Sequence, residues 1–265
     1  MDKIKLLKEF YNTIDRNVIK LGLKDYGFDL LKMFQNELTV DYVSLEKAYH
    51  WYRLSNISPQ RFNYFLKHHI EQNGNICGYF DKTANSVFDF NLDAKPETTK
   101  EEIEATRYIL TGILVTIGIK PLVVVSGRGY HVWVKLEQPI DNDRIGLFMF
   151  GVCARIKWFL EQNSLNSNSV DIGCYPYGEE KQKLSLRLFG SRHVDTLQFS
   201  NVVDYGFYKD ANEGWYEILN EERSWEYFER YLKEGQISVE TFDEAFNENV
   251  RAWGQQCKPE IAKAI

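Results

Sequence analysis

The most constraining feature of this 265-residue chain is a change of hydrophobic period that repeats in a set order between residues 76 and 190. Alternating, branched stretches predict strands, and apolar residues every three or four positions predict helices. In chain order the pattern predicts a strand at 86–94, a helix at 98–118, strands at 120–126 and 129–136, a helix at 141–163, and strands at 169–175 and 183–190. The order β-α-β-β-α-β is typical of an α+β fold with an RRM-like, or ferredoxin-like, core.

Both flanks of this core are predicted to be helical. Before it, helical spacing of apolar residues occurs in residues 3–21, 27–38, 44–54 and 58–74. Ser58 is a candidate N-cap, with Pro59 at the first helical position. After the core the chain is acidic and again helical in pattern. The expected divisions are an N-terminal helical region (1–75), the core (76–215) and an acidic C-terminal helical region (216–265).

The charge distribution leaves nucleic-acid binding open. The formal net charge of -6 opposes it, because a phosphate backbone is bound through Lys and Arg. Of the 38 acidic and 32 basic residues, 13 and 6 lie in residues 210–265, which leaves 25 and 26 in residues 1–209. A locally basic groove in the main body is therefore compatible with the composition.

The sequence predicts a soluble, cytoplasmic protein without a membrane partner. No run approaches 18 uninterrupted apolar residues, and the N-terminus has the pattern of an amphipathic helix rather than of a signal peptide. The four cysteines are scattered singly, which predicts neither a disulfide framework nor a zinc site.

A polar stripe on the first core strand contains candidate metal ligands. Because side chains alternate along a strand, Asp89, Asn91 and Asp93 share one face, and Phe88, Phe90 and Leu92 share the other. Paired acids on a strand can hold divalent ions. Here the middle group is an amide, and Asp89 and Asp93 are about 13 Å apart along the strand. A polar stripe facing solvent is the alternative interpretation.

The turn at residues 126–131, with the sequence SGRGYH, has the chemistry of an anion site. Ser126 supplies a hydroxyl, Arg128 a guanidinium that can grip phosphate oxygens at two points, and His131 a further donor. Each residue alone fits an ordinary hairpin. Together, between the end of one strand and the start of the next, they favour an anion cradle.

A second basic group follows in the sequence LSLRLFGSRH, residues 184–193. It contains Arg187, Ser191, Arg192 and His193. Between the two groups, Asp171 lies between branched residues and is a candidate third carboxylate ligand.

In this order the segments resemble the archaeo-eukaryotic primase superfamily, which includes primase-polymerase (prim-pol) catalytic domains. The family pattern is an acidic Asp-x-Asp/Glu strand, a Ser-Gly-x-Gly-x-His turn, an isolated Asp and a later LxRLPGSxH-like segment. The corresponding stretches here are FNLDAK (90–95) or FDFNL (88–92), then SGRGYHVWV, Asp171 and LSLRLFGSRH. The resemblance covers about residues 76–200.

The resemblance implies a DNA primase or polymerase that synthesises or extends primers from NTPs or dNTPs by two-metal-ion catalysis with Mg²⁺ or Mn²⁺. It also implies nucleoside triphosphates and single-stranded or primer-template DNA as partners, and a helicase or other replication protein as a possible further one. The nucleotide-binding residues it implies are Ser126, Arg128, His131, Arg187, Ser191 and His193. The catalytic and metal-binding residues it implies are Asp89, Asn91, Asp93 and Asp171.

Asn91 departs from the family pattern, because an amide carries no charge with which to hold a hard dication. Either Asp89 substitutes for the missing acid, or the protein is a weak family member, or Asp has been changed to Asn to stop turnover. The alternative function is a non-catalytic module that binds nucleotides or nucleic acid on the same fold.

Overall fold

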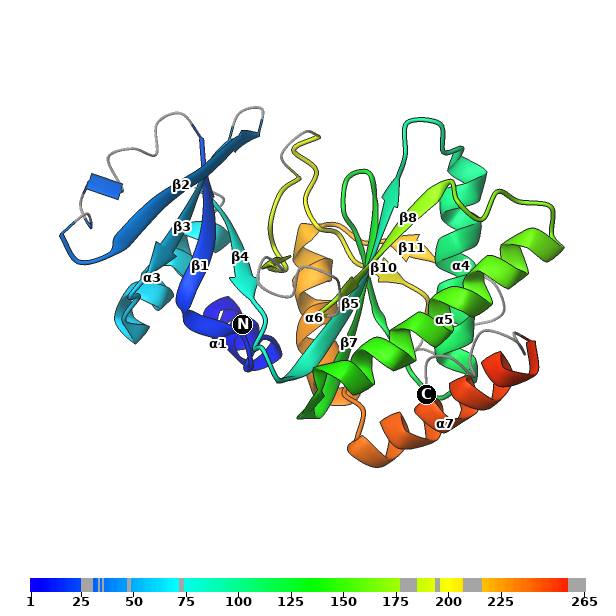
Figure 1. Cartoon of the computed structure of the whole chain (residues 1–265). Coiled ribbons are helices and arrows are strands. Elements are labelled where there is room, and N and C mark those ends of the chain that lie inside the picture. The colour runs from blue at the N-terminus through cyan, green and yellow to red at the C-terminus, as the bar shows by residue number, and fades with distance from the viewer. Residues whose placement is uncertain are drawn as a thin grey trace.

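The structure is a computed structural model with two antiparallel sheets beside each other and helices packed around them (Figure 1). The residues it describes are 1–24, 31–32, 34, 36–46, 49–71, 74–176, 185–193, 196–206 and 216–256. Within these, no helix is both long and apolar enough to span a lipid bilayer.

The central sheet has four strands in the order β6-β7-β5-β8, all antiparallel to their neighbours. Its elements follow one another along the chain as β5 (Ala84–Ala94), α4 (Lys100–Thr116), β6 (Leu122–Val125), β7 (Gly129–Asp141), α5 (Asn142–Gln162) and β8 (Val170–Tyr175). The α+β class is confirmed, and these elements lie where the sequence predicted them. At the start of α4, Thr99 and Glu102 form the capping box that their spacing indicates.

Helices α4 and α5 cover only one face of this sheet. Phe88, Phe90 and Leu92 point toward them and are buried in a core shared with α4, α5 and α7. The opposite face carries the polar members of β5. The alternation predicted for this strand is therefore present, and it decides which side of the sheet can hold a site.

The N-terminal region is not the helical layer predicted from the sequence. It contains α1 (Lys3–Phe10), β1 (Asp15–Leu23), β2 (Thr39–Glu46), β3 (Tyr49–Ser55), α3 (Pro59–Ile70) and β4 (Asn75–Tyr79). The helices at 3–10 and 59–70 are confirmed, the latter with Ser58 accepting a hydrogen bond from the Arg61 N–H. Half of the helix predicted at 27–38 falls outside the described residues.

Helix was the wrong prediction for residues 15–21 and 44–54, which form β1, the end of β2 and β3 where described. In β1, Ile19, Leu21 and Leu23 are buried, whereas Lys20 between them is only half-buried. This alternation is the period of a strand, and pairing with β3 and β4 on either side satisfies its backbone. Contacts distant in sequence therefore override the local helical pattern.

The second sheet has the order β2-β3-β1-β4-β9, in which β9 (Ser185–Arg187) returns from the far end of the core. The strand predicted at 183–190 thus pairs with β4 and not with the central sheet. Pairing between β1 and β4 crosses the division expected at residue 75.

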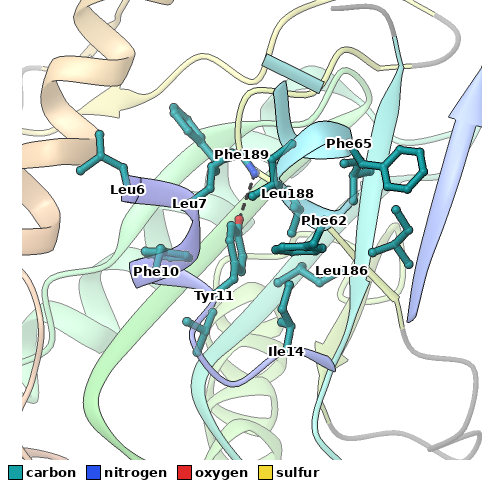
Figure 2. Close-up of a cluster of buried hydrophobic side chains, with 14 of the residues drawn as sticks. Leu6, Leu7, Phe10, Tyr11, Ile14, Phe62, Phe65, Leu186, Leu188 and Phe189 are labelled. Carbon is teal, nitrogen blue, oxygen red and sulfur yellow. Dashed lines mark hydrogen bonds between the residues drawn. The ribbon is translucent and has the colours of Figure 1, made fainter. Parts of the chain in front are cut away.

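A shared core ties the two sheets together around α1 (Figure 2). Leu7, Phe10 and Tyr11 pack with apolar residues of α3, β9 and the segment after it. The Tyr11 hydroxyl accepts a hydrogen bond of 3.0 Å from the Phe189 N–H. Trp133 of the central sheet belongs to the same core and contacts Phe10, Tyr11 and Phe189. Packed side chains around α1 therefore fix the two sheets relative to each other.

The C-terminal helices are confirmed as α6 (Glu221–Glu234) and α7 (Val239–Gln256). Helix α6 buries Trp225, Phe228 and Tyr231 in the shared core, and α7 buries Phe242 against α5 and β5. A short pair of strands, β10 (Val203–Asp204) and β11 (Glu217–Ile218), lies beside β6.

Candidate functional site

A cavity of about 190 Å³ lies between the two sheets and brings together residues from both candidate groups. Eight of the ten predicted site residues line it: Asp89, Asn91, Asp93, Ser126, Arg128, His131, Arg187 and His193. Asp171 and Ser191 do not.

The pairing of β5 with its two neighbours explains how the acidic part is assembled. Asn91 lies opposite His131 of β7 on one side and Gly173 of β8 on the other. In the same register Asp93 lies opposite Asp171, and Asp89 lies opposite Tyr175. Residues opposite one another in antiparallel strands share a face. The open face of the sheet therefore carries three carboxylates, an imidazole and a phenol.

Asp89 is buried and bonded to His131. Its Oδ2 lies 2.7 Å from Nδ1 of His131, and the Asp89 side chain has 0% exposure. Its second oxygen, Oδ1, is buried without a hydrogen-bond partner among the described residues. Because Nδ1 faces the carboxylate, Nε2 is the ring nitrogen left for a ligand in the cavity. Asp89 therefore does not face solvent, unlike the side chains of the polar stripe in the alternative interpretation.

Asn91 and Asp93 interact with each other. The Asn91 amide donates from Nδ2 to Asp93 Oδ2 at 3.0 Å, and Arg128 Nη2 lies 3.9 Å from Asp93 Oδ1. The exposed Asp171 adjoins Asp93 across the strand pair, just outside the cavity. Because Asn91 donates from Nδ2 to one Asp93 oxygen, the Oδ1 atom of the same amide points away from that hydrogen bond.

The pKa of Tyr175 responds to the negative charges on this face of the sheet. Burial is the main reason that its pKa is raised above the ordinary value. Asp89, Asp93 and Asp171 raise it further, because each opposes formation of a phenolate. The three carboxylates lie on two strands, and all three are close enough to Tyr175 to raise its pKa.

Glycines allow the turn between β6 and β7 to approach both walls of the cavity. Gly127 has φ +96°, and a Cβ there would overlap the His193 ring. A Cβ on Gly129 would overlap the backbone carbonyl of Leu92. The Ser126 N–H bonds to Gly129 O at 2.9 Å, and the buried Ser126 Oγ has no partner among the described residues. The turn thus presents an unsatisfied hydroxyl beside a guanidinium that is 58% exposed.

The second basic group is divided by the fold. Arg187 lies on β9 opposite Cys77 of β4, and its side chain lines the cavity together with His193. Ser191 is fully buried and lies 3.3 Å from Ser200 Oγ, so the structure places it in the interior. Arg192 forms an ion pair with Glu221 at 3.3 Å.

Six lining residues were not among the sequence candidates: Lys20, Trp51, Cys77, Tyr175, Ser185 and Leu186. Three of them lie on β1, β3 and β4, in a sheet whose first strands were predicted as helices. Lys20 lies over the Trp51 ring, 4.7 Å from its centroid. Strict alternation of apolar and other residues in 19–23 was the signal for this sheet.

The cavity therefore has an acidic and a cationic side. Its carboxylates come from β5, whereas its cations come from β1, β9 and the β6–β7 turn. Among the described residues no three His, Cys, Asp or Glu side chains are grouped as a ready-made metal site. The available oxygen donors are the carboxylates of Asp93 and Asp171 and the Asn91 amide oxygen, a hard donor set that fits Mg²⁺ or Mn²⁺ in type.

Comparison with known proteins finds similarity in structure but not in sequence. No protein-family model matches the sequence, and neither does the sequence of any curated protein. A similar structure is the polymerase domain from Mycobacterium tuberculosis Ligase D in complex with DNA, with 13% identity, 89% of each chain covered and a TM-score of 0.48. At this level of similarity, an activity has to be argued from the side chains of the site.

Proposed function

We propose that this chain is a template-directed nucleotidyltransferase of the primase-polymerase type, built on a ferredoxin-like core, which binds a nucleoside triphosphate between its two sheets. The observation that carries the proposal is a single cavity in which carboxylates of β5 face the Ser126, Arg128 and His131 cradle. Transfer of a nucleotidyl group needs this pairing, because cations and donors bind the triphosphate while carboxylates hold the metal at the reacting phosphate.

The cationic side suits the triphosphate. Ser126 Oγ and His131 Nε2 would donate to phosphate oxygens, and Arg128 would grip two oxygens at once. Arg187 and His193 also line the cavity and would complete the pocket. Asp89 would contribute through His131, by holding the imidazole with Nε2 toward the ligand.

The acidic side suits divalent ions. Asp93 and Asp171 would hold Mg²⁺ or Mn²⁺, with the Asn91 amide oxygen as a neutral ligand. Such ions, when bound, lower the pKa of the attacking 3′-hydroxyl and neutralise charge on the departing pyrophosphate. The Asn91 N–H positions Asp93, and Arg128 limits repulsion between that carboxylate and the triphosphate. Single-stranded or primer-template DNA would supply the 3′-hydroxyl and the templating base.

Asn91 also favours the second candidate function, a module that binds nucleotides without catalysis. The amide removes one negative charge from the metal-binding face and engages an Asp93 oxygen that could otherwise bind the ion. Both effects would weaken metal binding while leaving the triphosphate cradle unchanged.

The deciding experiment measures two quantities on the full chain and on Asn91→Asp and Asp171→Ala. Triphosphate binding is followed by calorimetry, with and without Mn²⁺. Incorporation of labelled nucleotides is followed on primed and unprimed single-stranded templates. The nucleotidyltransferase proposal expects template-dependent incorporation that increases in Asn91→Asp and disappears in Asp171→Ala.

Binding without incorporation in any of these proteins, including Asn91→Asp, would identify the non-catalytic module. Absence of triphosphate binding would reject both functions. Incorporation that is unaffected by Asp171→Ala would show that the metal ligands are assigned wrongly.

A further inference from the structure

A second and larger cavity, of about 480 Å³, lies on the five-stranded sheet. Its walls come from the start of β1 and the residues that lead into it, from β3, and from β4 with the turn that follows it. Its lining includes Arg16, Arg53, Tyr79 and Lys82, together with the carboxylates of Asp15 and Asp81. None of them belongs to the site described above.

The two cavities are neighbours on the same face of this sheet. Lys20 of the first cavity lies directly opposite Arg53 of the second, and Ser185 of the first lies opposite Tyr79 of the second. Cys77 and Tyr79 are two residues apart on β4 and therefore point the same way. The lining residues thus continue from one cavity to the other across adjacent strands.

Cations form a row across this face. Arg53, Lys20 and Arg187 lie on β3, β1 and β9, in register with one another through Cys77 of β4. Three strand spacings separate the ends of the row, about 14 Å. The row points from the second cavity toward the nucleotide cradle.

The cations of the second cavity form no ion pair with a described carboxylate, and the exposed Asp41 of β2, which lies opposite Arg53, is not bonded to it. Arg16 donates to the backbone carbonyl of Lys8 at 3.1 Å, and neither Arg53 nor Lys82 forms an ion pair with a described residue. The Arg53 guanidinium lies over the Tyr79 ring, 5.8 Å from its centroid. A guanidinium packed on a partly exposed aromatic ring forms with it a surface on which a nucleobase can stack.

The two carboxylates of this lining accept hydrogen bonds from the backbone. Asp15 Oδ1 accepts from the Asn17 N–H at 2.8 Å. Asp81 Oδ1 accepts from the Thr83 N–H and hydroxyl and from the Ala84 N–H. These hydrogen bonds hold both carboxylates in local turns, and the three cations of the lining outnumber them.

We infer that this second cavity binds the backbone and a base of a single-stranded nucleic acid whose continuation enters the first cavity. Arg16, Arg53 and Lys82 contact phosphates, and Tyr79 stacks on a base. The inference rests on the proposed function for the destination of the strand. It also shows how a chain with a net charge of -6 can bind a polyanion through a local row of cations.

The test compares two double variants of the full chain, each of which removes two positive charges. Arg53→Ala with Lys82→Ala alters the second cavity. Arg230→Ala with Lys157→Ala alters exposed cations of α6 and α5, outside both cavities. Binding of a fluorescent single-stranded oligonucleotide is measured by anisotropy over a range of salt concentrations, and triphosphate binding is measured separately by calorimetry.

The cavity variant should bind the oligonucleotide about tenfold or more weakly, with a salt slope reduced by about 1.4 for two lost phosphate contacts. The control variant should retain both values, and triphosphate binding should be the same in all proteins. Tyr79→Phe should retain oligonucleotide binding, whereas Tyr79→Ala should weaken it. Circular dichroism confirms that each variant is folded.

Equal oligonucleotide affinity in the cavity variant and the control would overturn the inference, as would an unmodified chain that binds no oligonucleotide. Loss of triphosphate binding together with oligonucleotide binding would also overturn it, because the cavity would then serve the nucleotide. Failure of the proposed function has a different signature: no triphosphate binding or incorporation by the unmodified chain, with oligonucleotide binding that still depends on the second cavity.

Discussion

His131 and Asp89 are bonded across neighbouring strands, with Nδ1 of the imidazole 2.7 Å from Oδ2 of a carboxylate that has no exposed surface. They are diagonal neighbours, since His131 lies opposite Asn91 and Asp89 lies two residues before it on β5. In the proposed function this bond would give Asp89 a role distinct from that of Asp93. Asp89 would orient a histidine that binds the nucleotide, whereas Asp93 would bind an ion.

Replacing Asp89 with Asn tests this positioning role. The amide keeps the size of the side chain but loses the charge that holds His131, so triphosphate binding should weaken by about 1.5–3 kcal/mol. The measurement is calorimetric titration of Asp89→Asn, His131→Ala and the double variant. If Asp89 acts through His131, the double variant should bind no more weakly than His131→Ala. Additive losses would contradict the role.

Arg128 should contribute a two-point contact to the triphosphate. Arg128→Ala is expected to weaken binding by roughly 1–3 kcal/mol. Arg128→Lys should recover only part of the loss, because an ammonium is a point charge. Arg251→Ala, which removes an exposed cation of α7, is the matched control. Equal affinities of Arg128→Ala and Arg251→Ala would remove Arg128 from the site.

Gly127 should be required for the approach of the turn to His193. Its φ of +96° disfavours any side chain, and a Cβ would overlap the imidazole. Gly127→Ala is expected to lower the free energy of unfolding by about 1–3 kcal/mol and to reduce triphosphate binding.

Gly112→Ala is the control for this change. Gly112 lies within α4, and a Cβ there has no heavy atom within 4 Å, so the substitution should stabilise the helix by up to about 1 kcal/mol. Urea unfolding of both variants gives the comparison. A Gly127→Ala protein as stable as Gly112→Ala would show that the turn tolerates a side chain.

His69 should make the protein sensitive to acid. It is buried between α3 and the segment after β9, with Nε2 2.9 Å from Phe189 O and Nδ1 accepting from the Ile76 N–H. Burial lowers its pKa from the ordinary 6.5 to about 4. Below pH 6.5 the unfolded chain therefore takes up a proton that the folded protein refuses until pH approaches 4. The free energy of unfolding falls through this window as pH falls.

Urea unfolding at pH 7.5 and pH 5.0 measures this effect. His69→Gln retains a donor and an acceptor but cannot be protonated, so the unmodified protein should lose about 2 kcal/mol more than the variant between these pH values. The same pH dependence in both proteins would show that His69 does not carry the sensitivity.

The sequence determined features that depend on neighbours along the chain. The alternation at 88–93 separates Phe88 from Asp89, and the capping box begins α4 at its observed place. Gly127 and Gly129 permit the turn that carries Ser126 and Arg128. These features follow from backbone geometry within a few residues, which is why they could be predicted without a partner.

The tertiary structure decided what depends on segments far apart in the sequence. Residues 15–23 carry a strand alternation at 19–23 as well as a helical spacing, and only pairing with β3 and β4 decides between the two. The strand at 49–55 likewise depends on partners on other strands. For the same reason a local pattern could not show that β9 joins β4, that Ser191 turns inward, or that Lys20 and Trp51 face the cradle. The sequence motifs supply the polar side chains of one wall of the cavity, whereas pairing between strands distant in sequence supplies the other wall.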